Sequence, residues 1–273
     1  MFNSKFRLRL FLFFVLILVL IAIFAPAIAP FDPNEATLSN ANIKPNDVNI
    51  FGTDKMGRDI FSRVVFGART SLFYTFVLVC TIFIIGSTLG IISGYMGGGV
   101  DTVIMRIADM MVSFPGMALA ISLAGVLGPS LTNAVIAITL VSWTKYARLS
   151  RSLVLKVKNM DYIHASRLSG SSHLKIIKNH LIPSILPTLV VTASTDVGAM
   201  MLELASFSFL GLGATANSIE WGYMLNEGRE AMFSSPWIMI YPGICIFITV
   251  VIFNLLGDSI RDNLDPKQKL KGA

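Results

Sequence analysis

The sequence predicts an all-α membrane protein with six transmembrane helices. The chain has 273 residues, of which 54% are hydrophobic and only 14% are charged, whereas soluble domains carry about 25% charged residues. It also contains several long apolar runs, and an apolar helix of about 20 residues spans a bilayer. Six such helices take a little under half of the chain, so no long polar stretch remains to build a large soluble catalytic domain.

The six expected spans are set apart by Gly, Pro and polar turn residues. The first follows a short basic N-terminus, and Pro26, Pro30 and Pro33 stand where a signal peptide would have its small-residue cleavage site, which indicates an uncleaved span. We expect two parts: the first span and a polar extracytoplasmic segment in residues 1–69, and a core domain in residues 70–273. The predicted spans cover residues 9–29, 71–96, 104–127, 131–149, 184–210 and 237–257.

The Lys and Arg residues predict how these helices are oriented. Basic residues concentrate in the cytoplasmic loops of membrane proteins. When the N-terminus is placed in the cytoplasm, 16 of the 22 Lys and Arg residues lie in inside segments and six in outside loops. We therefore expect a multi-pass protein of the inner cell membrane with both termini cytoplasmic. The net charge of +6 is assigned to these loops rather than to nucleic-acid binding.

The basic segment of residues 150–182 is longer than the two to eight residues that usually connect helices. It predicts two short amphipathic helices, the first of which covers residues 153–169. Gly170 favours a helix end, because glycine adopts positive φ at little cost. One of the two serines that follow can cap the second helix, and Pro183 is expected to stop that helix at the membrane surface. The alternative is a basic loop that lies on anionic lipid.

The stretch His164-Ala165-Ser166 resembles the start of the EAA loop of bacterial ABC importer permeases, which reads Glu-Ala-Ala. The resemblance continues through Gly170, where the family has a glycine, to Pro183, which ends the family's Ile-x-Leu-Pro. It implies that this helical turn docks in a groove of the ATP-hydrolysing subunit and transmits its motion. His164 replaces the usual Glu, so the resemblance carries over the packing role of the small residues and of Gly170, and not a salt bridge.

Further blocks resemble the dipeptide, oligopeptide and nickel permeases of this family, in the same order and spacing, and place the chain with the shorter, C-type subunit. The resemblance implies the type I ABC importer permease fold, with a cytoplasmic coupling loop at residues 150–182 of a core permease domain. It also implies a heterodimer with a second permease subunit, two ATPase subunits and an extracytoplasmic solute-binding protein. The blocks lie at residues 51–63, 98–101, 209–213, 220–222 and 253–258, the last with 261–262 and 264–266.

Local features bring the chain closer to nickel-import permeases than to peptide permeases. These features are Trp143 with Tyr146-Ala147-Arg148, the Ala165 to Gly170 stretch, and a block after Gly211 that lacks the proline-rich continuation of peptide permeases. The cargo implied is nickel or a chelated metal. The alternative is import of dipeptides or oligopeptides by the same architecture.

The sequence lacks the features of an enzyme. Nothing matches the GxxxxGK[ST] nucleotide-binding loop, so ATP must be hydrolysed by partner subunits, and neither a catalytic residue nor a cofactor is expected. An integral-membrane enzyme would need His, Asp or Glu clustered at one depth, and here they are scattered. An ion channel or secondary carrier is a further alternative, and it would transport without ATPase partners.

Asp196 and Glu203 are the candidate pathway residues. They lie seven residues apart in the fifth span, close to two helical turns, so both are expected on one side. A carboxylate in hydrocarbon costs at least ~2.5 kcal/mol and usually faces a cavity or a partner. The two acids either line the translocation path and attract a cation, or bond to a neighbouring helix. Asp109 is expected to pair with Arg106, one turn earlier.

No metal site is expected in the chain. The three histidines, His164, His173 and His180, are spaced by nine and seven residues, which is not the i, i+4 spacing of a helical chelate. The two cysteines form no CxxC pair, and most methionines are expected to serve packing. The aromatic residues around the start of the sixth span are expected to anchor it at the membrane interface, and the alternative is contact with a docked binding protein. They are Trp221, Tyr223, Trp237 and Tyr241.

Overall fold

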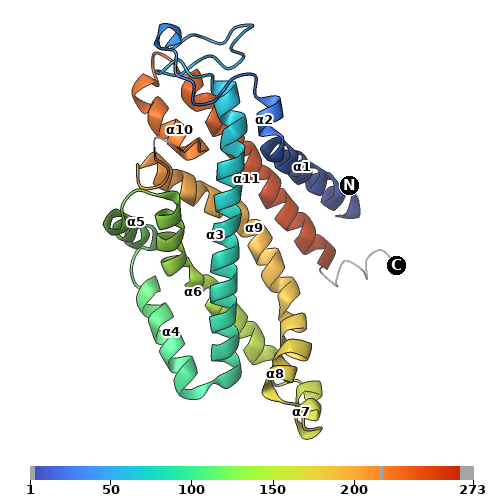
Figure 1. Ribbon diagram of the computed structural model, residues 1–273. Coiled ribbons are helices and arrows are strands. Elements are labelled where there is room, and N and C mark those ends of the chain that lie inside the picture. Colours follow the sequence, from blue (N-terminus) through green and yellow to red (C-terminus); the bar gives the residue numbers. More distant parts are fainter. Residues whose placement is uncertain (1–3, 216–217, 265–273) are drawn as a thin grey trace.

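The computed structural model describes residues 4–215 and 218–264, and these residues form helices joined by loops, of which the segment of residues 29–59 is the longest, with no β-strand among them (Figure 1). The helices are α1 (Ser4–Ile23), α2 (Ala25–Ile28), α3 (Ile60–Met96), α4 (Gly98–Val112), α5 (Gly116–Leu127), α6 (Leu131–Val157), α7 (Asp161–Leu168), α8 (His173–Ile176), α9 (Ile182–Phe209), α10 (Trp221–Gly228) and α11 (Trp237–Leu264).

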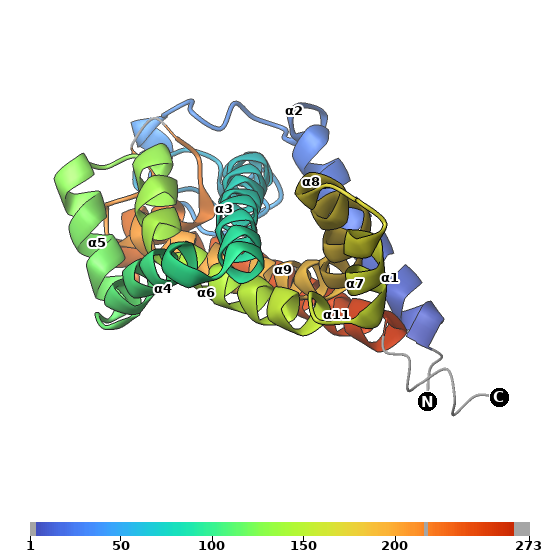
Figure 2. The same ribbon diagram turned by 90° about the horizontal axis from the view of Figure 1, so that it is seen from below.

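The long helices form a bundle with α3 at its centre. Figure 1 shows α10 and the 30–59 segment at one end of this bundle, and α7 and α8 at the other. These are called the α10 end and the α7–α8 end below. Seen from the α7–α8 end in Figure 2, α4 and α5 lie on one side of α3, and α1 and α11 on the other.

Four helical segments are long and apolar enough to cross a membrane. They are Lys5–Ile23, Ile60–Met96, His173–Phe209 and Trp237–Leu264, and the bent pair of α4 and α5 makes five if it forms one span. The sixth expected span lies in α6, which carries Lys145, Arg148 and Arg151 and does not meet the same criterion. The predicted all-α membrane fold is confirmed, while the count of six spans is not matched by length and composition alone.

The expected third span, residues 104–127, is not one helix. The structure breaks it after Val112 and resumes at Gly116, with a bend of 90° between α4 and α5. Pro115 explains the break, because proline lacks the N–H that a continuing helix would use and disfavours helical backbone in the residue before it. In the sequence, Pro115 lies within a continuous apolar run, so the run predicts one span without a break.

Two boundaries expected in residues 150–182 are also wrong. The helix expected over residues 153–169 is divided, because α6 continues to Val157 and α7 begins only at Asp161. Pro183 does not stop the second helix, since α8 leads through a π-helical turn, Ile177–Leu181, directly into α9. The π-helical turn lies just before Pro183. This proline has no N–H to donate, and in a regular α-helix its ring would meet the preceding carbonyl groups.

A stripe of three glycines brings α3 against α6. Gly86, Gly90 and Gly94 recur every fourth residue on one face of α3 and are buried. A Cβ at Gly90 would overlap the carbonyl oxygen of Ala147 and the hydroxyl of Ser150. Small residues at this spacing let two helix backbones touch within a membrane. The α3–α6 contact is therefore made at backbone distance.

We predict that Gly90→Ala lowers the free energy of unfolding by roughly 1–3 kcal/mol, the usual cost of overpacking a filled interface. Gly125→Ala is the matched control, because Gly125 is exposed on α5 with open space around it, and alanine is the better helix former by about 1 kcal/mol. Thermal unfolding of the two purified variants in detergent measures the difference. Equal melting temperatures would contradict the backbone-distance contact.

Candidate functional site

The predicted turn is formed by α7 and α8, and Gly170 ends α7 as expected. Gly170 has φ +78°. Its N–H donates to the carbonyl of Arg167 at 3.0 Å, and the N–H of Ser171 donates to the carbonyl of Ser166 at 3.1 Å. This pair of bonds is the Schellman motif that closes a helix with a left-handed glycine. The hydroxyl of Ser172 then accepts from the N–H of Lys175 and caps α8.

The inner side of this two-helix turn, residues 161–176, is fixed to the bundle. Ile163, Ile176 and Leu181 are fully buried in the same apolar cluster as Val154 and the rest of α6. Their burial holds α7 and α8 against α6 and α9. The turn therefore projects from the bundle and is held in place by buried side chains.

The outer side of the turn is exposed and apolar. Leu168 is 91% exposed and Leu174 is 79% exposed, one on each side of Gly170. Basic side chains lie beside them, at Arg167, Lys175 and Lys178. A fully exposed leucine pair on a rigid projection is suited to a protein partner.

The structure places the predicted turn residues as follows. His164, Ala165 and Pro183 are exposed. Ser166 is half-buried, and its hydroxyl lies 3.3 Å from Nε2 of His180, which links α7 to the turn before α9. Ala165 thus faces outward beside the exposed leucines, whereas Ser166 faces the interior of the turn.

An ion pair at the α7–α8 end was not foreseen from the sequence. Asp101, in the first turn of α4, accepts two hydrogen bonds from Arg151 of α6, at 2.5 and 2.6 Å, and one from the hydroxyl of Ser93. Nearby, Nζ of Lys158 donates to the carbonyl of Gly94 at 2.7 Å. These bonds join the ends of α3, α4 and α6 into one unit.

Asp196 and Glu203 have different surroundings. Asp196 is buried and binds Nζ of Lys145 at 2.6 and 2.8 Å and the hydroxyl of Tyr146 at 2.8 Å, both on α6. This is a bond to a neighbouring helix, the alternative that the sequence left open. Glu203 is half-buried and makes no hydrogen bond or ion pair with any described residue.

A second ion-pair cluster lies at the α10 end. Arg58 and Arg63 each bond both Asp54 and Glu227, at 2.5–2.8 Å, and all four side chains are nearly buried. Burial lowers the pKa of Arg58, but hydrogen bonds and charge from Glu227 and Asp54 outweigh this and leave it raised. Sequence spacing gave no signal for this cluster, because Glu227 lies far along the chain. It ties the 30–59 segment to α10.

Glu220 is a further buried acid at this end, 2% exposed, and it caps α10. Burial raises the pKa of Glu220, against the backbone hydrogen bonds from Gly222 and Tyr223 that favour its charged form. Its Oε1 also lies 3.1 Å from the hydroxyl of Ser71 on α3. The cap thus fastens α10 to α3.

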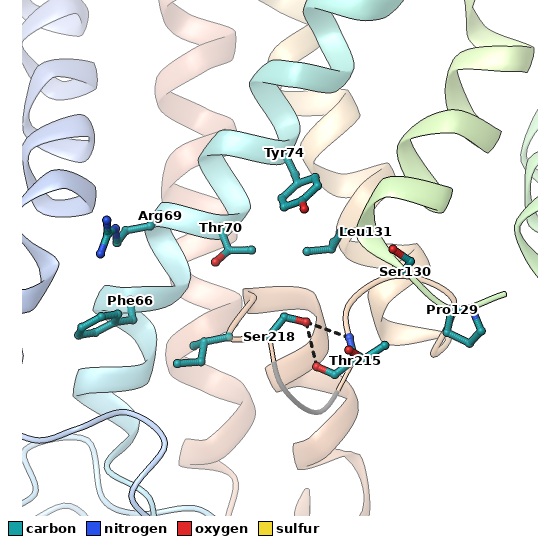
Figure 3. A pocket seen from close by; sticks show the side chains of 10 residues that line it. Phe66, Arg69, Thr70, Tyr74, Pro129, Ser130, Leu131, Thr215 and Ser218 are labelled. Atoms are coloured by element: carbon teal, nitrogen blue, oxygen red, sulfur yellow. Dashed lines mark hydrogen bonds between the residues drawn. The ribbon is translucent and has the colours of Figure 1, made fainter. Parts of the chain in front are cut away.

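A polar cavity of about 520 Å³ opens near the α10 end, between α3, the start of α6 and the loop after α9 (Figure 3). In Figure 3, Thr70 and Tyr74 point toward Leu131, whereas Arg69 points to the opposite side of α3. Arg69 makes no ion pair within the described part of the chain. Neither predicted pathway acid lines this cavity.

Two expectations about single residues are wrong. Asp109 does not pair with Arg106. It pairs with Arg148 of α6 at 2.8 Å, since its neighbour Ala108 packs against Trp143 and Ala147 of α6. Trp221 is not an interfacial anchor, since it is only 2% exposed and donates to the carbonyl of Val64 at 2.9 Å.

The other three aromatic residues pack at the α10 end. Trp237 donates to the carbonyl of Thr53 at 3.2 Å, and Tyr241 stacks on Phe51 at a ring distance of 3.9 Å. Tyr223 takes part in the first turn of α10, where its N–H donates to Glu220. The contacts of Trp237 and Tyr241 hold the 30–59 segment on α11.

The described residues contain no group of three or more His, Cys, Asp or Glu side chains that could hold a metal ion. His173 and His180 instead bond to Tyr95 and Ser166, respectively. Cys80 and Cys245 are free thiols.

Comparison with known families gives two matches. The family described as "Binding-protein-dependent transport system inner membrane component" matches residues 86–270. The family described as "N-terminal TM domain of oligopeptide transport permease C" matches residues 9–45. Together they cover most of the chain, and the first match includes the two-helix turn as well as Asp196 and Glu203.

Similar proteins and structures agree with these families. The nickel transport system permease protein NikC of Escherichia coli (strain K12) is 42% identical over 97% of this chain and 95% of its own length. The dipeptide transport system permease protein DppC of Alkalihalophilus pseudofirmus is 44% identical over 91% and 82%, respectively. A chain of the inward-facing MetNI methionine ABC transporter shares the fold, with a TM-score of 0.61 and 20% identity over 74% of this chain and 97% of that chain.

In this family the permease component spans the inner membrane and works with ATPase and substrate-binding partners, so ATP is hydrolysed outside this chain. The helical fold, the length of the family match and the 42% identity over nearly the whole chain agree with one another. The chain belongs to the family of binding-protein-dependent transport system inner membrane components and is a permease of an ABC importer, not an enzyme.

Proposed function

We propose that this chain imports nickel or a chelated metal, as one half of a permease heterodimer. The near end-to-end match with the E. coli nickel permease carries this proposal, since it covers 97% of this chain and 95% of that protein. In the complete importer, two ATPase subunits lie on one side of the membrane and a solute-binding protein on the other.

The second candidate cargo is a dipeptide or oligopeptide. Its support is the 44% identity to the dipeptide permease of Alkalihalophilus pseudofirmus, of which the chain covers 82%. The probable D,D-dipeptide permease DdpC of E. coli (strain K12) is also 44% identical, with the same coverage of its length. Identity alone therefore favours neither cargo, and the extent of the match favours nickel.

We place the α7–α8 end and both termini in the cytoplasm. The positive-inside rule supports this orientation, because 16 of 22 Lys and Arg residues fall on that side. The 30–59 segment and α10 then lie outside the cytoplasm, where the binding protein arrives. In this arrangement residues 1–69 are an added N-terminal span with its extracytoplasmic segment, and residues 70–273 are the core permease domain.

The two-helix turn is the contact with the ATPase. Leu168 and Leu174 present an exposed apolar surface on it, and buried isoleucines fix it to α6 and α9. When ATP draws the ATPase pair together, the turn moves with it and carries α6 and α9 along. The permease pair then changes from inward-open to outward-open by rigid-body rocking. His164 is exposed and contributes no salt bridge of the kind a glutamate would give.

Glu203 is the better of the two pathway candidates. Asp196 is neutralised by Lys145 and bonded to Tyr146, so it offers little attraction to a cation. Glu203 has no partner among the described residues, and an unpaired carboxylate at membrane depth is costly unless it faces water, a cavity or another subunit. We assign Glu203 to the cargo pathway and Asp196 to holding α9 against α6.

We predict that Gly170→Pro uncouples ATP hydrolysis from import. Proline fixes φ near −65° and lacks the N–H that Gly170, at φ +78°, donates to Arg167. Cargo transported per ATP should fall by roughly 5- to 150-fold, the range of typical coupling energies. A bulky residue at the exposed Ala165 should act in the same direction. Transport and ATP hydrolysis by the complete importer in lipid vesicles measure the ratio.

Gly128→Pro is the matched control for this experiment. Gly128 ends α5 with φ +86° and donates to the carbonyl of Ala124, as Gly170 does in α7, but it lies far from the turn. It should lower thermal stability without changing the cargo carried per ATP. A well-expressed Gly170→Pro importer with the wild-type ratio would count against the assignment of the turn.

A further prediction separates the two acids. Asp196→Asn leaves Lys145, which is 56% exposed, without its charge partner and should lower the free energy of unfolding by roughly 0.5–1.5 kcal/mol. Glu203→Gln should leave the melting temperature unchanged and reduce uptake. Thermal unfolding and uptake measured on the same preparations test both statements. Normal uptake by the Glu203 variant would remove it from the pathway.

The cargo is decided by uptake in cells that lack this chain. Radioactive nickel uptake should be lost, uptake of radiolabelled dialanine should remain, and the restored chain should recover nickel uptake. The reverse pattern would establish the peptide alternative. Loss of uptake when an ATPase subunit is removed excludes a channel or secondary carrier.

A further inference from the structure

Tyr95, near the end of α3, contacts both helices of the two-helix turn. Its hydroxyl lies 2.8 Å from Nδ1 of His173 in α8, and the two rings meet edge-on with centroids 5.7 Å apart. The guanidinium of Arg167 in α7 lies 5.8 Å from the centroid of the same ring. Tyr95 therefore holds residues on both sides of Gly170.

The chain itself joins the turn to α6 and α9, but not to α3. Within the described residues, every hydrogen bond, ion pair and ring contact between α3 and the two-helix turn involves Tyr95. Its contacts are of two kinds, a directional hydrogen bond and a cation over an aromatic face. Besides the path through α6, which packs against α3 at the glycine stripe, motion of the turn therefore reaches α3 directly through one side chain.

Tyr95 stands on a rigid base. Its neighbour Gly94 accepts a hydrogen bond from Lys158 of α6, and Ser93 bonds to Asp101 of α4, which is held in turn by Arg151. The end of α3 is thus fixed to α4 and to the end of α6. A pull on Tyr95 therefore displaces this whole unit instead of bending the end of α3.

We propose that Tyr95 is a positioning residue that couples α3 to the two-helix turn. The proposal rests on the function proposed above, in which the turn follows the ATPase. When the turn moves, Tyr95 links it directly to α3, in addition to the path through α6. Because α3 extends to the cluster of Arg63 and Asp54, the displacement reaches the α10 end.

The test compares Tyr95→Phe, Tyr95→Ala and Met96→Ala in the complete importer in lipid vesicles. The probe is radioactive nickel, or radiolabelled dialanine if the wild-type importer carries that instead. Tyr95→Phe keeps the ring and loses the hydroxyl, so cargo carried per ATP should fall roughly 2- to 10-fold, as expected for one hydrogen bond. Tyr95→Ala should lose more. Met96, the exposed neighbour at 65%, is the matched control and should keep the wild-type ratio.

A double variant shows whether Tyr95 acts through His173. His173→Ala alone should lower the ratio as Tyr95→Phe does, and the double variant should be no worse than either single one. The amount of assembled importer and its melting temperature should stay near those of the wild type for Tyr95→Phe. Parallel losses of assembly, ATP hydrolysis and transport would show a merely structural residue and overturn the proposal.

The remaining outcomes separate this inference from the proposed function. If Tyr95→Phe carries as much cargo per ATP as the wild type while Gly170→Pro uncouples, the role of Tyr95 is wrong and the turn keeps its function. If neither variant changes the ratio, both assignments are wrong. If Tyr95→Ala does not assemble, Tyr95→Phe decides the question, because it keeps the ring against Arg167.

Discussion

The close approach of α3 to α6 is the contact on which the rest of the structure depends. In lipid, two helices gain no hydrophobic free energy by meeting, so packing between their backbones must hold them. Gly86, Gly90 and Gly94 provide that packing, since a Cβ at each would meet α6. The two-helix turn continues from α6, and α4 is tied to the same pair by Asp101 and Arg151. Loss of this contact would loosen α3 from the helix that leads into the turn.

Most charges inside this fold are paired, and the pairs join helices. The Arg63–Asp54 and Arg151–Asp101 pairs lie toward opposite ends of α3, and Lys145 pairs with Asp196 between α6 and α9. For the buried Arg63–Asp54 pair, breaking the pair costs more than its formation contributes, because the remaining charge has no solvent. The pairs therefore fix which helices move together. Glu203 departs from this pattern, which is why it is the acid assigned to cargo.

The sequence predicted features that are local. Apolar runs located the long helices, and Gly170 with a following serine located the turn, because a left-handed glycine and a cap act within a few residues. The break at Pro115 was hidden by its apolar surroundings. The pairing of Arg58 and Arg63 with Glu227 was not accessible, since it depends on how distant helices meet. The spacing of the glycines on α3 could have predicted close helix packing, but composition and span length do not take this spacing into account.

The length of α3 has a mechanical consequence. Its 37 residues extend about 55 Å at 1.5 Å per residue, whereas the hydrocarbon layer is about 30 Å thick. One straight rod therefore protrudes into water on both faces of the bilayer, with Asp59 at one tip and Gly97 at the other. Tilting such a rod about its middle swings its two tips in opposite directions. A single rigid helix can thus respond both to the nucleotide state on one face of the membrane and to cargo occupancy on the other, while every helix keeps its structure.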